Sequence, residues 1–128
     1  MSKNIHDYKI ISYNVNFNSN EIIFNASSYE DKNIIITFKE VLVHSFKIEM
    51  PNSIILDIEK FNIEKMIEEN KELLEENKNY CWPILYDNMD ELAKKLKNYN
   101  YYTINSSYGL CGWILAKELE VNTNMKDI

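Results

Sequence analysis

The chain contains no arginine and no glutamine, and it has only two residues each of glycine, proline, cysteine and histidine. Without arginine it has no guanidinium fork for bidentate binding of phosphate or guanine, and its net charge of −6 repels a nucleic-acid backbone. We therefore expect no nucleic-acid partner. Lysine supplies all 14 basic residues, while asparagine, isoleucine and glutamate abound, as in proteins from AT-rich bacterial genomes.

Long apolar runs are also missing. None approaches the roughly 18 residues that cross a bilayer, and the N-terminal stretch MSKNIHDYK lacks the apolar segment of a signal peptide. We expect a cytoplasmic protein with no membrane partner, whose two cysteines stay reduced. With 128 residues and 45% hydrophobic content, the chain is expected to form one domain over residues 1–128.

The first half of the chain predicts about five antiparallel strands. Apolar and polar side chains alternate from Ile11 to Phe17, which places Ile11, Tyr13, Val15 and Phe17 on one face. A polar pair, Lys39 and Glu40, indicates a bulge or bend in a later strand region. The expected strands are 8–17, 21–27, 34–40, 41–49 and 54–59; in the last, Ile54, Leu56 and Ile58 share a face.

The period of the apolar residues changes at Phe61, and two helices are predicted, at about 62–78 and 88–98. Asn62 is the expected N-cap of the first helix. The seven glutamates of residues 59–76 are expected to form a solvated face. Asn88 and Glu91 have the spacing of a capping box at the start of the second helix.

The C-terminal region predicts a β-hairpin in which residues 101–105 pair with residues 113–121. Both glycines of the chain, Gly109 and Gly112, fall in the expected reversal, where they supply positive φ angles or close backbone approach. As a strand, the returning segment places Trp113, Leu115, Leu119 and Val121 on one face. A C-terminal helix that begins at either glycine is the alternative. The fold class is therefore α+β.

Motifs for catalysis, metal binding or nucleotide binding are missing: the sequence has no CxxC, no HExxH and no phosphate-binding glycine loop. We expect no catalytic residue, no metal and no cofactor. His44 alternates with Leu42 and Phe46 on one strand face, where a histidine is more often packed than catalytic. Cys111 lies in the expected turn, and no neighbour in the sequence would activate its thiol.

The aromatic residues are unevenly distributed. All five phenylalanines occur by Phe61, whereas both tryptophans and six of the nine tyrosines lie between Tyr80 and Trp113. Tyrosine and tryptophan are enriched in protein interfaces, although they also fill seams between sheets and helices. The candidate partner-binding residues are Tyr80, Trp82, Tyr86, Tyr101, Tyr102, Tyr108, Trp113 and Glu118.

These observations favour a small acidic binding protein over an enzyme. The leading hypothesis is an immunity protein, or another inhibitor, that neutralises a bacterial toxin or other basic protein partner by covering its surface. The alternative is a small enzyme or ligand-binding domain with a cleft formed by Cys111, His44 and a carboxylate. A homo-oligomer stays compatible with the sequence.

Overall fold

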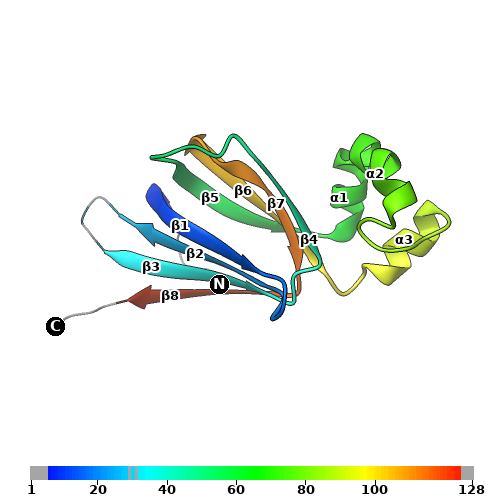
Figure 1. Cartoon of the computed structure of the whole chain (residues 1–128), viewed down its shortest axis with the longest axis horizontal. Helices are drawn as coiled ribbons and strands as arrows, with labels where there is room; N and C mark the ends of the chain where they lie inside the picture. The colour runs from blue at the N-terminus through cyan, green and yellow to red at the C-terminus, as the bar shows by residue number, and fades with distance from the viewer. Residues whose placement is uncertain (1–5, 29, 31, 125–128) are drawn as a thin grey trace.

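A computed structural model describes residues 6–28, 30 and 32–124 of the chain (Figure 1). The described residues form one antiparallel sheet of eight strands and three α-helices, an α+β fold. The strands are β1 (Tyr8–Asn16), β2 (Glu21–Ser27), β3 (Asn33–Lys39), β4 (Val43–Lys47), β5 (Ile54–Phe61), β6 (Asn100–Tyr108), β7 (Cys111–Ala116) and β8 (Glu118–Asn124). The helices are α1 (Ile63–Glu69), α2 (Lys71–Asn77) and α3 (Met89–Lys95), with a 3-10 turn η1 (Lys78–Tyr80) after α2.

The sheet curves around its own core. Its strand order is β4-β7-β6-β5-β1-β2-β3-β8, so the consecutive strands β3 and β4 lie far apart in the order, as do β7 and β8. Two backbone hydrogen bonds lie between the β3–β8 pair and the β4–β7 pair. Leu42 N donates to Leu115 O at 2.9 Å, and Lys117 N donates to Lys39 O at 3.1 Å. The long segments 33–47 and 111–124 therefore pair along both of their halves, and the two ends of the sheet meet.

Two hydrophobic cores result from this arrangement. The first lies inside the curved sheet and contains Ile22, Phe24, Ile36, Phe38, Ile55 and Ile114, all without exposed surface. The second lies between the helices and the outer face of β6 and β7, and it contains Met66, Leu74, Leu92, Leu96 and Leu115. Figure 1 shows the three helices gathered beside the ends of β4, β6 and β7. Both faces of β7 are consequently buried.

The five predicted N-terminal strands are present as β1 to β5, and the predicted faces of two of them are only partly right. Tyr13, Val15 and Ile58 pack against the first core as predicted, whereas Ile11 and Leu56 do not, and Phe17 lies beyond the end of β1 and is exposed. Register shifts interrupt the alternation after Ile10 in β1 and on either side of Ile55 in β5. A bulge inserts one extra residue and turns the following side chains to the other face. Ile11 and Leu56 therefore point outward, with 59% and 36% of their surface exposed, while Ile10 and Ile55 face the first core.

The predicted C-terminal hairpin is confirmed as β6 and β7, and the alternative of a C-terminal helix is wrong. The predicted returning strand is divided at Lys117 into β7 and β8. Trp113 packs in the second core, whereas Leu119 and Val121 pack against the first. These side chains therefore do not share one face, because the bend at Lys117 exchanges the two faces.

The first predicted helix is two helices. Asn62 caps α1 as expected, since its side chain accepts a 3.2 Å hydrogen bond from Lys65 N. Asn70 then leaves the helical conformation, with φ −122° and ψ 31°, and separates α1 from α2. The second predicted helix, α3, begins as expected: Asn88 accepts from Glu91 N at 2.9 Å.

Both glycines occupy positions that a side chain could not. Gly109 has φ +82° in the turn between β6 and β7, and a Cβ atom there would collide with the side chain of Ser53. Gly112 has φ +151°, and its Cβ would collide with the Ser45 carbonyl oxygen on β4. The concentration of glycine in this stretch is thus a requirement of the hairpin and of its close contact with β4.

Candidate binding cleft

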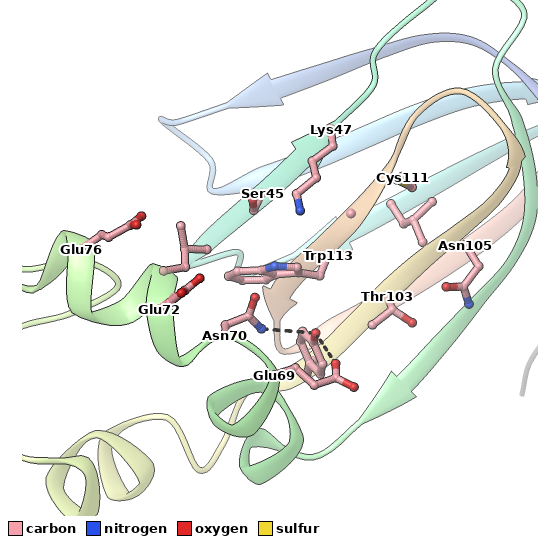
Figure 2. A pocket seen from close by; sticks show the side chains of 14 residues that line it. Ser45, Lys47, Glu69, Asn70, Glu72, Glu76, Thr103, Asn105, Cys111 and Trp113 are labelled. Carbon is pink, nitrogen blue, oxygen red and sulfur yellow. Dashed lines mark hydrogen bonds between the residues drawn. The ribbon is translucent and has the colours of Figure 1, made fainter.

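A cleft of about 500 Å³ lies between α1 and α2 on one side and the outer face of β4, β6 and β7 on the other (Figure 2). Its position follows from strand register, which aligns side chains in rows across this face. The row Phe61, Tyr101, Leu115 and Val43 is covered by the helices. The next row along the strands contains Thr103, Trp113 and Ser45, which line the cleft, and Glu59, which is paired with Thr103 outside the lining.

The helical wall of the cleft is acidic. Glu69 ends α1, and Glu72 and Glu76 lie one turn apart on α2, with Leu73 between them in the lining. Lys47 on β4 is the one lysine among the lining residues, and Figure 2 shows its ammonium pointing into the cleft from the opposite wall. Glu69 is paired with Lys65, which leaves Glu72 and Glu76 against Lys47 and gives the cleft a negative potential that a basic group would favour.

A cluster of three aromatic rings lies at the floor of the cleft. Trp113 lines it with 8% of its surface exposed. The Trp113 ring lies 5.8 Å from the Tyr101 ring, edge to face, and 6.0 Å from the Trp82 ring. Such contacts hold an aromatic side chain in one orientation, so the floor is a fixed apolar surface next to the carboxylates.

A hydrogen-bond network joins the acidic wall to the sheet. The Tyr101 hydroxyl donates to Glu69 Oε1 at 2.8 Å and accepts from Asn70 Nδ2 at 3.3 Å. Burial raises the pKa of Tyr101 to about 12, with a smaller contribution from Glu69. The Tyr101 hydrogen bond, followed by Lys65, lowers the pKa of Glu69, so this carboxylate stays ionised in neutral solution.

Further acidic groups border the open end of the sheet face. Asn105 lines the cleft, and its Nδ2 donates to Asp57 Oδ1 at 2.7 Å and to Glu59 Oε1 at 3.0 Å. The amide therefore bridges two carboxylates on β5 and keeps both beside the cleft. Because the Asn105 amide carries no charge, it does not neutralise the Asp57 and Glu59 carboxylates, and the negative region extends from α2 to β5.

Two small groups of the sheet face complete the lining. The Thr103 hydroxyl oxygen is buried and finds no hydrogen-bond partner among the described residues. Buried hydroxyl groups are normally satisfied, so Thr103 is an exception in this part of the sheet. Cys111 also lines the cleft as a partly exposed free thiol, whereas Cys81 is an exposed free thiol outside the lining.

The structure disperses the partner-binding residues that the sequence suggested. Tyr86, Tyr101, Tyr102 and Trp113 are buried, with 3 to 8% of their surface exposed. Trp82 is half-buried against the second core. Tyr80, Tyr108 and Glu118 are exposed, and they lie on η1, at the end of β6 and on β8. Packing between sheet and helices therefore accounts for most of the aromatic concentration, and only Tyr101 and Trp113 of this set line the cleft.

His44 and Cys111 do not form a common site. Cys111 pairs with Lys47 in the β4–β7 ladder, three positions from the His44–Ile114 pair, so the two side chains fall on opposite faces of the sheet. His44 stacks on Phe46 at 4.7 Å and lines a separate cavity of about 50 Å³. Burial lowers the pKa of His44, partly offset by Glu49. The cleft predicted from Cys111, His44 and a carboxylate is not present as such.

Sequence reasoning missed the acidic wall. The seven glutamates of residues 59–76 are all exposed, as predicted, and three of them, Glu69, Glu72 and Glu76, also line the cleft. Glu72 and Glu76 are four residues apart on α2, and this spacing of one helical turn was the available signal. Glu69 lies on α1, beyond the break at Asn70, so the helical repeat does not relate it to them. No sequence pattern indicated that Thr103, Asn105 and Lys47 belong to the cleft, because strand register alone brings them to the same face.

In comparisons with known proteins, no protein-family model, curated protein or solved structure matches the chain. Within the described ranges, no group of three or more His, Cys, Asp or Glu residues is placed to hold a metal ion. None of the helices described above is long and apolar enough to cross a membrane.

Proposed function

We propose that the protein is a small acidic binding protein that captures a basic protein partner at the cleft, and that it acts as an immunity protein or other inhibitor of a bacterial toxin. The observation that carries this proposal is the acidic wall of Glu69, Glu72 and Glu76 above the fixed Trp113 floor. A concave surface with aligned carboxylates and an apolar base suits a protruding basic segment. The partner's functional surface is then covered rather than modified.

The charge of the whole chain supports the same role. A net charge of −6 attracts a basic protein over a distance and raises the rate of encounter, an effect that salt weakens. The cleft then supplies a local site where the partner can be retained. Long-range steering affects the association rate, whereas contacts in the cleft affect dissociation, so the two contributions are measurable separately.

The test is neutralisation of a toxin encoded beside this gene. The neighbouring product is produced alone and together with this protein, and bacterial growth and complex formation are measured. We expect growth arrest by the neighbour alone, rescue by this protein, and loss of rescue in Glu72→Lys/Glu76→Lys. A neighbour that neither binds this protein nor is neutralised by it contradicts the proposal.

The matched control is Glu68→Lys/Glu75→Lys. Glu68 is exposed on α1 and Glu75 on α2, both lie outside the cleft lining, and their replacement changes the net charge by the same amount as the test pair. We expect the control to slow association while rescue persists. Loss of rescue in both variants would show that net charge, and not the cleft, retains the partner.

A further inference from the structure

Two carboxylates of the acidic wall are not neutralised by the chain itself. Glu69 forms an ion pair with Lys65 at 3.2 Å and accepts from Tyr101. Glu72 and Glu76 form no ion pair with any lysine of the described residues, although Lys47 lines the same cleft. Like charges at this spacing on one helix repel each other, so an entering cation relieves an unfavourable contact.

The floor beside these carboxylates suits the rest of a long cationic side chain. Trp113 is held by Tyr101 and Trp82, and the part of its ring that lines the cleft offers an apolar and π surface. Lysine and arginine carry an aliphatic stem that packs on apolar surface and a charged group that favours aromatic rings and carboxylates.

We infer that the cleft receives a lysine or arginine side chain of the partner, with its stem against Trp113 and its charged group at the Glu72 and Glu76 carboxylates. This inference rests on the proposed function and specifies the group that is recognised. A volume of about 500 Å³ accommodates one such side chain together with neighbouring partner atoms. Lys47 on the opposite wall works against the cation, so its removal is expected to strengthen binding.

The experiment uses the intact chain and a heptalysine peptide, with heptaarginine as a second probe and fully acetylated heptalysine as the uncharged control. The first measurement is the rate of thiol labelling. Cys111 lines the cleft and Cys81 is exposed outside it, so each chain carries its own reference thiol. We expect heptalysine to slow labelling of Cys111 and to leave the Cys81 rate unchanged, while the acetylated peptide affects neither thiol.

The second measurement is affinity in matched variants. Glu72→Gln/Glu76→Gln is expected to weaken heptalysine binding about fivefold, and Glu68→Gln/Glu75→Gln less than about twofold, because only the first pair lines the cleft. Lys47→Ala is expected to strengthen binding about twofold, while Lys71→Ala on the exposed side of α2 serves as its control. Trp82→Phe leaves Trp113 as the single tryptophan, whose fluorescence should change on binding.

The outcomes separate this inference from the proposed function. If the toxin partner is bound and neutralised but Cys111 labelling and Trp113 fluorescence do not respond, the inference is overturned and the proposed function stands. Equal weakening in both glutamate pairs also overturns it, because general charge attraction would then suffice. If the peptides protect Cys111 but no neighbouring product is neutralised, the cation site stands and the proposed function fails.

Discussion

The hydroxyl group of Tyr101 on β6 donates a 2.8 Å hydrogen bond to Glu69 Oε1 at the end of α1, and it accepts a 3.3 Å hydrogen bond from Asn70. Asn70 also donates to Met66 O at 2.9 Å, so its side chain links the last turn of α1 to the sheet. Tyr101 therefore contacts both the last residue of α1 and the residue at which the helix breaks. Glu72 and Glu76 follow this break on α2 and line the cleft.

Replacement of Tyr101 by phenylalanine tests this link. Tyr101→Phe keeps the ring contact with Trp113 but removes the hydroxyl, so the free energy of unfolding should fall by about 1 kcal/mol. The pKa of Glu69 should rise toward its ordinary value, because its largest stabilising hydrogen bond is lost. Urea unfolding measures the first effect, and NMR titration of the Glu69 side chain measures the second.

Tyr80→Phe is the control, since Tyr80 is 79% exposed and its hydroxyl makes no hydrogen bond within the described part of the chain. We expect no measurable change in stability for this variant. An unchanged Glu69 pKa in Tyr101→Phe would show that the network does not control the charge of the acidic wall.

Stability should depend on pH through His44. Burial lowers the pKa of His44 in the folded protein below 6.5, although Glu49 opposes this shift. The unfolded chain then binds more protons than the folded chain between the two pKa values, so the free energy of unfolding is retained above about pH 6.5 and falls as pH decreases. Urea unfolding between pH 5 and 8 measures this dependence. We expect His44→Gln to reduce the slope and His6→Gln, at an exposed site, to preserve it.

The positions of the first five strands along the chain could be predicted from alternation, but the faces of β1 and β5 only in part: Tyr13, Val15 and Ile58 face the core as predicted, whereas Ile11 and Leu56 do not. Alternation specifies a face only while the register is continuous, and bulges in β1 and β5 interrupt it. Ile10 and Ile11 are both apolar, as are Ile55 and Leu56, so the sequence carries no mark of which residue is inserted. A bulge is defined by the pairing of a strand with its neighbours, so its position depends on tertiary structure.

Neighbouring alanine substitutions in β5 test the bulge directly. Ile55 has no exposed surface and belongs to the first core, whereas Leu56 is 36% exposed. Ile55→Ala should lower the free energy of unfolding by about 3 kcal/mol, and Leu56→Ala by less than about 1 kcal/mol. Equilibrium denaturation of both variants gives the comparison. The reverse order would restore the face predicted from alternation and contradict the register of β5.

The cleft shows a similar division between local and tertiary information. The spacing of Glu72 and Glu76 on α2 is local and readable, because a helix repeats every 3.6 residues, whereas the placement of Glu69 beside them depends on the break at Asn70. The floor is not readable, since Thr103 and Trp113 become neighbours only through the pairing of β6 with β7, and Ser45 through the pairing of β7 with β4. Aromatic content alone suggested a surface, whereas burial shows that most of those rings are packed.

The close approach of Gly112 to the Ser45 backbone predicts that no other residue fits at position 112 without loss of stability. A Cβ atom at residue 112 would collide with the Ser45 carbonyl oxygen, and backbone atoms cannot move aside as a flexible side chain can. The φ angle of +151° adds strain for any other residue. Gly112→Ala should therefore lower the free energy of unfolding by about 2 to 4 kcal/mol, measured by urea denaturation. Ser107→Ala, at an exposed site of the same hairpin, should change it by less than about 0.5 kcal/mol. A Gly112→Ala protein of unchanged stability would mean that β4 does not approach β7 as closely as the structure has it, and the wall of the cleft formed by β4 would then have to lie elsewhere.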